Sequence, residues 1–203
     1  MTTTISRLYS NYGDARAAVR QLEAAGVPHN DIGIIASNAE NFYDNGKDTY
    51  PDRDLDGKDD RAESAGTGAA VGAAVGGGAG LLAGLGLMAI PGVGPVVAAG
   101  WLVSTLAGAA VGGATGGALG ALTQAGISDD DAHVYAEGLR RGGAVVSARV
   151  AENDATRLQA VMDRSAVRIA DRAATYRKSG WNKFDPNAAP YTADQVKKER
   201  SLY

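Results

Sequence analysis

The sequence predicts an α+β protein, and three observations support this prediction. A strand-helix-strand pattern occurs near the start of the 203-residue chain and recurs after residue 143. Between these two patterns, the 65 residues from 64 to 128 carry no charge and hold 19 of the 28 glycines. A further helix, with its own start and stop signals, follows this stretch. Composition and charge divide the chain into five parts: residues 1–38, 39–63, 64–126, 127–170 and 171–203.

The first part, residues 1–38, is predicted to be a β-α-β unit. Residues 4–9 are expected to form a short strand, and residues 14–25 a helix that Gly26 ends. The helix has the i, i+3, i+4, i+7 spacing of one apolar face, made by Ala15, Ala18, Val19 and Leu22. A second strand is expected around residues 32–35.

The fourth part, residues 127–170, is predicted to contain the extra helix and a second β-α-β unit. The extra helix has Ser128 as its expected N-cap and Gly142 as its expected end. Residues 144–150 are predicted to form a strand and residues 167–169 a final strand, with a helix between them. That helix has an apolar face made by Ala155, Leu158, Val161 and Met162. Two such units on one sheet make a ferredoxin-like domain, in which the residues between about 38 and 143 are an insertion.

Glycines in the uncharged stretch recur at four-residue intervals. The first ladder is Gly68, Gly72, Gly76, Gly80 and Gly84; the second is Gly100, Ser104, Gly108, Gly112, Gly116 and Gly120. On a helix, this spacing makes a stripe of small residues that another helix can approach to backbone contact. Prolines and glycines in residues 90–95 predict a turn between two helical arms, residues 64–89 and 95–125. The sequence therefore predicts an antiparallel glycine-zipper helical hairpin.

A glycine inside a helix costs roughly 0.8–1 kcal/mol relative to alanine, so each arm needs a close partner, which the other arm can provide. Five glycines off the main ladders leave smooth faces for neighbouring molecules, so the hairpin predicts a homo-oligomer: Gly77, Gly78, Gly86, Gly113 and Gly117. Each arm, at about 1.5 Å per residue, is long enough to cross a hydrocarbon core of about 30 Å. Two settings stay open. The hairpin either spans the inner membrane, with lipid as a further partner and the rest of the protein on the cytoplasmic face, or lies between subunits of a soluble cytoplasmic cage, ring or filament.

The acidic second part, residues 39–63, contains a match to a twelve-residue calcium loop. Its five expected ligands are Asp52, Asp54, Asp56, Asp60 and Glu63. Carboxylates at alternating positions converge on one hard cation, and Gly57 allows the sharp turn. Asp59 stands where a hydrophobic residue is usual, and Pro51 precludes a normal incoming helix. A single calcium-binding loop, acting as a calcium-responsive switch, and a solvated acidic linker both stay open.

The composition disfavours catalysis and nucleic-acid binding. The chain has no cysteine and only two histidines, His29 and His133, so it lacks thiol nucleophiles and Cys/His metal clusters. With 23 acidic and 20 basic residues, its net charge of −3 provides no global basic field. We therefore expect no enzyme activity, no small-molecule substrate and no nucleic-acid partner.

The last part, residues 171–203, combines aromatic residues with a net charge of +3. Thr192 and Gln195 form a capping-box pattern that predicts a short terminal helix. Such a tail suits contact with a neighbouring subunit, an anionic membrane surface or stacked RNA bases. Subunit contact is the favoured interpretation, because a net charge of +3 would provide only weak affinity for nucleic acid.

Five segments of the chain together form a recognisable pattern: Asp14-Ala-Arg-Ala-Ala-Val-Arg-Gln-Leu22, Ala25-Gly-Val27, Gly66-Thr-Gly-Ala-Ala-Val-Gly72, Ala89-Ile-Pro-Gly-Val-Gly-Pro95 and Tyr135-Ala-Glu-Gly-Leu-Arg-Arg-Gly-Gly-Ala-Val-Val146. In these segments the sequence resembles the bacterial general stress protein family (heat-induced, YflT-like). The resemblance covers about residues 3–150 and implies a stress-induced, often membrane-associated protein with no established catalytic activity. It supplies no catalytic residues. Together with the hairpin, it predicts a non-enzymatic stress-response protein that self-associates in or on the inner membrane.

Overall fold

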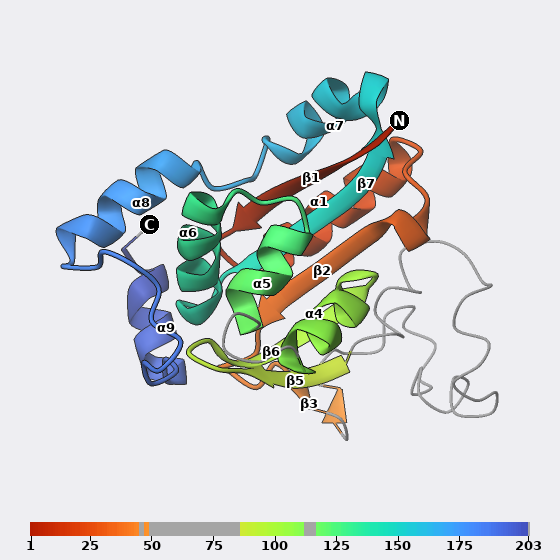
Figure 1. Ribbon diagram of the computed structural model, residues 1–203. Helices are drawn as coiled ribbons and strands as arrows, with labels where there is room; N and C mark the ends of the chain where they lie inside the picture. The colour runs from red at the N-terminus through yellow and green to blue at the C-terminus, as the bar shows by residue number, and fades with distance from the viewer. Residues whose placement is uncertain (45–46, 49–85, 112–116, 203) are drawn as a thin grey trace.

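The α+β class is confirmed by the computed structural model, which describes residues 1–44, 47–48, 86–111 and 117–202 (Figure 1). The described strands of the main sheet are, in spatial order, β1 (Thr2–Tyr9), β7 (Ala144–Ala151), β2 (Ile32–Ser37), β6 (Gly94–Gly100) and β5 (Gly86–Ile90). All neighbouring pairs are antiparallel. A separate small ladder joins β3 (Tyr43–Asp44) to β4 (Lys47–Asp48).

The described helices number seven: α1 (Tyr12–Ala24), α4 (Leu102–Val111), α5 (Gly117–Gln124), α6 (Asp129–Arg140), α7 (Ala155–Met162), α8 (Ile169–Lys178) and α9 (Ala193–Arg200). Two single turns of 3-10 helix, His29–Asp31 and Glu152–Asp154, precede β2 and α7 respectively. The predicted helix starts are confirmed at Ser128, whose side chain accepts from the Asp131 backbone N–H, and at Thr192, which forms a full capping box with Gln195.

The first predicted β-α-β unit is confirmed by β1, α1 and β2. Asn11 caps α1 by accepting a hydrogen bond from the Asp14 backbone N–H, and Gly26 follows the helix at a φ of 93°. Because β1 and β2 are both antiparallel to β7, they run parallel to each other with β7 between them. Two parallel strands joined by a helix, with an antiparallel strand between them, agree with the first β-α-β unit predicted from the sequence.

The predicted final strand at residues 167–169 is wrong. Ile169 begins α8, and the only strand-like feature of this segment is a hydrogen bond of 2.7 Å from the Val167 backbone N–H to the Leu8 carbonyl. The apolar alternation spans just three residues, which is too short to hold a strand against the helix start provided by Asp171 in the first turn. The complete ferredoxin-like topology is therefore not confirmed.

The predicted helical hairpin is also wrong over residues 86–100, which form strands β5 and β6 around a turn. The turn itself is confirmed, with Gly92 and Gly94 at φ values of 74° and 103°. β6 extends the sheet beyond β2, with pairs running from Gly33 opposite Gly100 to Ser37 opposite Val96. The strand outcompetes the helix because β2 would otherwise be left with an unpaired edge and because Val96 and Val97 favour a pleated sheet.

The ladder glycines are distributed over different structures. Gly100 ends β6, whereas Gly108 and Gly120 lie in α4 and α5, two short helices that pack together. The others lie outside the described residues: Gly68, Gly72, Gly76, Gly80, Gly84, Gly112 and Gly116.

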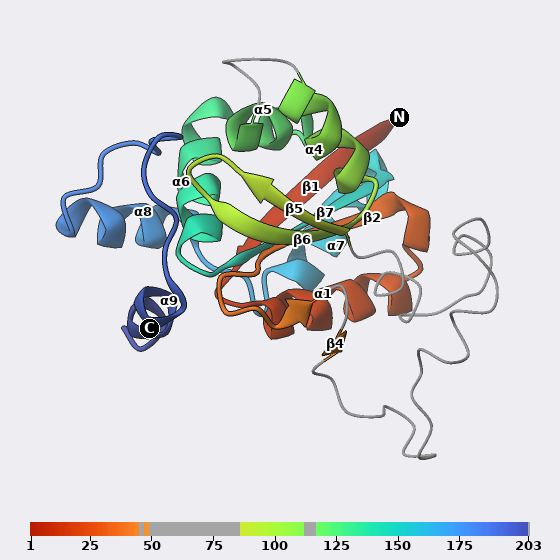
Figure 2. The same cartoon turned by 90° about the horizontal axis from the view of Figure 1, so that it is seen from below.

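The sheet lies between two helical layers (Figure 2). On one face, α1 and α7 pack on alternate residues such as Ile34 and Val146. On the other face, α4, α5 and α6 cover Ile35 and Val145. The inserted residues thus supply two strands and the whole second helical layer.

The C-terminal tail packs against its own chain. Tyr176 and Trp181 join Val134 of α6 in a small apolar cluster, and Phe184 enters the core beside the turn between β5 and β6. Val196 of α9 is 1% exposed and lies against Gly142. Three aromatic side chains of the tail, Tyr176, Trp181 and Phe184, are therefore buried within the chain itself.

The strand assignment of Gly100 predicts the sign of a stability change. Its φ is 72°, and an alanine Cβ there would lie 2.1 Å from the Ile32 carbonyl oxygen. We expect Gly100→Ala to lower the free energy of unfolding by about 3 kcal/mol, as measured by urea denaturation. In a helix interior, the same substitution would raise it by about 1 kcal/mol.

Gly180→Ala is the matched control for backbone strain. Gly180 has a φ of 83°, but a Cβ there meets nothing within 4 Å. This variant should lose only about 1 kcal/mol. Equal losses at the two positions, or a gain at Gly100, would contradict the position of β6 against β2.

Candidate functional site

The predicted calcium ligands cannot be compared with the structure. Asp52, Asp54, Asp56, Asp60 and Glu63 all lie outside the described residues, so the calcium loop stays a prediction. Within the ranges that are described, no group of three or more His, Cys, Asp or Glu side chains is placed to hold a metal ion. Likewise, none of the described helices combines the length and apolarity needed to cross a membrane.

A buried network of ion pairs lies at the end of α6. Glu137 is completely buried on this helix. Arg140 donates to it from Nε at 2.9 Å and from Nη2 at 2.7 Å, and Arg141 donates from Nε at 2.6 Å. The two arginines follow Glu137 at i+3 and i+4, so the helix itself brings the three side chains together.

The network extends from α6 to the tail. Arg141 donates from Nη1 to Glu199 of α9 at 2.8 Å, and its guanidinium lies 4.2 Å from the centre of the Tyr176 ring on α8. Arg140 stacks over Tyr191 at 4.9 Å. Burial lowers the pKa of Arg141, but hydrogen bonds to Glu199 and Glu137 outweigh it and leave the pKa above its ordinary value.

The four charged groups of this network compensate each other. Two carboxylates, Glu137 and Glu199, accept from two guanidinium groups, and aromatic rings cover the remaining arginine faces. A second ion pair, between Arg200 and Glu40 at 2.7 Å, joins the end of α9 to the segment after β2. The arrangement is suited to fastening the tail onto the body of the fold.

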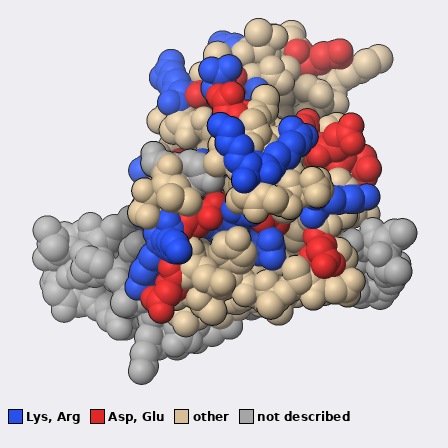
Figure 3. Space-filling model, turned by 90° about the vertical axis from the view of Figure 1, so that its left-hand side faces the viewer, with Lys and Arg blue, Asp and Glu red and all other residues tan. Residues whose placement is uncertain are grey.

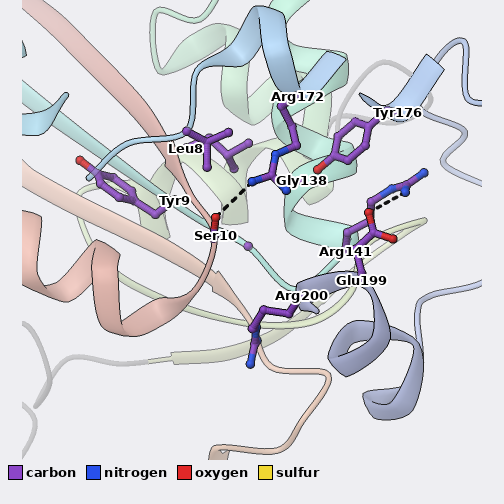
Figure 4. A pocket seen from close by; sticks show the side chains of 11 residues that line it. Leu8, Tyr9, Ser10, Gly138, Arg141, Arg172, Tyr176, Glu199 and Arg200 are labelled. Atoms are coloured by element: carbon purple, nitrogen blue, oxygen red, sulfur yellow. Dashed lines mark hydrogen bonds and ion pairs between the residues drawn. The ribbon is translucent and has the colours of Figure 1, made fainter. Parts of the chain in front are cut away.

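A small cavity lies beside the network, between the end of β1 and the helices α6, α8 and α9 (Figure 4). Arg172 points toward β1 and donates from Nη2 to Ser10 Oγ at 3.1 Å. The cavity measures about 20 Å³, which is room for about one water molecule and far below the size of a typical ligand pocket. The space suits a single bound water molecule and is too small for an organic substrate.

The outer surface on this side carries charges of both signs. Figure 3 shows Lys and Arg side chains interspersed with Asp and Glu rather than gathered into one field. The face offers little of the continuous positive potential that binds nucleic acid through its phosphates.

His133 lies on the same helix, one turn before Glu137, and is 9% exposed. Its Nδ1 has no hydrogen-bond partner among the described residues. Burial, followed by repulsion from Lys183, lowers the pKa of His133, while Asp129 and Asp130 oppose this shift. The neutral imidazole is therefore the form that the fold favours.

Comparison with family models, with curated proteins and with solved structures finds no match for this chain.

Sequence reasoning did not single out the Glu137 network. The i, i+3 and i+4 spacing of Glu137, Arg140 and Arg141 was visible and is a known sign of helical ion pairs. What could not be read from the spacing is that the tail covers these residues and brings Glu199 to Arg141 from 58 positions away.

Replacing Glu137 should test the network as a structural fastening. Glu137→Gln leaves two largely buried arginines without their shared carboxylate, since the side chains of Arg140 and Arg141 are 15% and 9% exposed. We expect a loss of about 3 kcal/mol in unfolding free energy, measured with urea. Glu152→Gln, at an exposed position, should stay within about 0.5 kcal/mol. A similar small change at Glu137 would mean that the network contributes no net stability.

The environment of His133 predicts a pH dependence. Because its pKa is lower in the folded chain than the ordinary value near 6.5, unfolding takes up a proton as the pH falls below about 6.5, and stability is lost in that range. Between pH 7.5 and 5.0, the unfolding free energy should fall further in the wild type than in His133→Gln. Parallel pH profiles for the two proteins would show that His133 is not coupled to folding.

Proposed function

We propose that this protein is non-enzymatic and works by associating with copies of itself through the uncharged part of the chain, residues 64–126. The observation that carries the proposal is the first glycine ladder, five glycines at unbroken four-residue spacing from Gly68 to Gly84 in a segment without charge. A helix of this composition is unstable alone in water, because every interior glycine costs roughly 0.8–1 kcal/mol. Close packing against a second backbone offsets that cost.

The described fold supports an intermolecular partner for this ladder. In the hairpin expected from the sequence, the second arm would have occupied the glycine stripe of the first. Residues 94–100 are instead committed to β6, and α4 and α5 pack on the sheet. Both faces of the described sheet already have a helical layer, so the ladder is not needed to cover either face.

The setting of the association is a separate part of the proposal. A membrane hairpin with arms at residues 64–89 and 95–125 does not agree with strands β5 and β6. Of the described helices in the second arm, α4 has 10 residues and α5 has 8, whereas a membrane span needs about 20. We therefore favour association between subunits of a protein assembly, and the resemblance to general stress proteins supports a role in the bacterial stress response.

Light scattering after size exclusion, combined with cell fractionation, tests this proposal on the full untagged chain. Gly76→Leu places a bulky side chain in the middle of the ladder and should lower the mass of the assembly at least twofold. Ala74→Leu, two residues away and off the ladder, should leave the mass unchanged.

A monomeric wild type, or equal masses for the two variants, would contradict association through the ladder. Recovery from the membrane fraction only with detergent would instead support the membrane setting. A uniform particle in the detergent-free fraction would support an assembly held by protein contacts.

A further inference from the structure

The outer edge of β5 is open within the described structure. β5 is the last strand of the five-stranded sheet, and its inner side pairs with β6 from Gly86 opposite Ala98 to Ile90 opposite Gly94. Figure 1 shows β5 at the lower edge of the sheet, with β6 beside it. Among the described strands, none pairs with its other side. An edge of this kind presents backbone N–H and C=O groups that can accept another strand.

The opposite edge of the sheet is partly occupied by the chain itself. In β1, the Ser6 carbonyl accepts from Tyr135 Oη at 3.1 Å and from Arg7 Nη1 at 2.9 Å. Two residues further along, the Leu8 carbonyl accepts from the Val167 backbone N–H. Alternate residues of an antiparallel strand direct their carbonyls to the same side, so these contacts occupy successive acceptors on one edge. These contacts therefore hinder a further strand from pairing with the second half of β1.

The sequence of β5 lacks two features that often protect an edge strand, charge and proline. Its sequence, Gly86-Leu-Met-Ala-Ile90, contains no charge and no proline. Leu87 and Met88 are half-buried and pack against the two opposite core clusters, while Ala89 is exposed. An added strand would cover Leu87 and Met88 on both faces of the sheet at once.

We propose that β5 of a second copy pairs antiparallel with this edge about a two-fold axis at Met88. This register uses all five residues, with Gly86 opposite Ile90 and Leu87 opposite Ala89, and joins two five-stranded sheets into one. A second copy is the occupant because the strand is uncharged and therefore does not repel its own copy, whereas like charges directly opposite would. Because the two copies of β5 use the same edge about the two-fold axis, this contact closes as a dimer.

This inference rests on the proposed self-association but assigns it to a different surface. Cross-linking tests it directly, because the natural chain has no cysteine. A two-fold axis at Met88 brings the two Cα atoms to about 4.5–5.5 Å, a distance that a disulfide can span. The full-length Met88→Cys variant, mildly oxidised at micromolar concentration, should give mostly covalent dimer on a non-reducing gel. Ala174→Cys, at an exposed position on α8, should give at most one fifth as much.

A blocking substitution provides an independent readout. Ala89→Lys adds a charge at the exposed position of the edge and should reduce the dimer yield of Met88→Cys at least fivefold, whereas Ala174→Lys in the same background should not. Circular dichroism of both double variants establishes that they are folded. No cross-link at Met88, or cross-linking that Ala89→Lys leaves unchanged, would overturn the β5 pairing.

The two experiments distinguish association through the glycine ladder from pairing through β5. If Gly76→Leu lowers the assembly mass but Met88→Cys does not cross-link, association through the ladder stands and pairing through β5 is wrong. If Met88→Cys cross-links while Gly76→Leu has no effect, pairing through β5 stands and the ladder proposal is wrong.

Discussion

The pairing of β7 with both β1 and β2 is the constraint on which the rest of the structure depends. β7 lies next to β1 along eight residue pairs and next to β2 along five, and its residues Val145 and Val146 are completely buried on opposite faces. This strand joins the two ends of an interval of more than one hundred residues, so its pairing closes a long loop at an entropic cost that grows slowly with length. Once the closure is made, each face of the sheet requires a helical layer, and the inserted residues supply one of them.

The first half of the fold could be predicted because local signals agreed with the tertiary structure. Apolar spacing in α1, the stop at Gly26 and, further along the chain, the Ser128 cap all act within a few residues of their own position. Residues 86–100 could not be predicted in the same way. A four-residue glycine spacing places residues on one side of a helix, but it also places them on one side of a strand, whose side chains repeat every two residues. The unpaired edge of β2 decides between the two, and that edge is not visible in the local sequence.

The ionic network illustrates the same division between local and distant information. Glu137 and its two arginines are set by helix geometry, so their pairing could have been expected. Their burial depends on the tail, where Trp181, Phe184 and Val196 pack on the chain and bring Glu199 to Arg141. The charged residues of the tail suggested contact with another molecule, but two of them, Glu199 and Arg200, form ion pairs with the rest of the chain. The apolar contacts and the ion pairs together make residues 171–202 part of the folded unit.

Native-state hydrogen exchange, resolved by residue with NMR, tests most directly whether the insertion belongs to one cooperative fold. Amides of β6 that face β2 should exchange with the same opening free energy as those in the centre of β7, because the sheet and its two helical layers unfold together. In the contrary case, β6 would exchange at a much lower opening free energy while β1, β7 and β2 stay protected. The inserted strands would then unfold independently of a smaller core, which would contradict a single cooperative unit that includes the insertion.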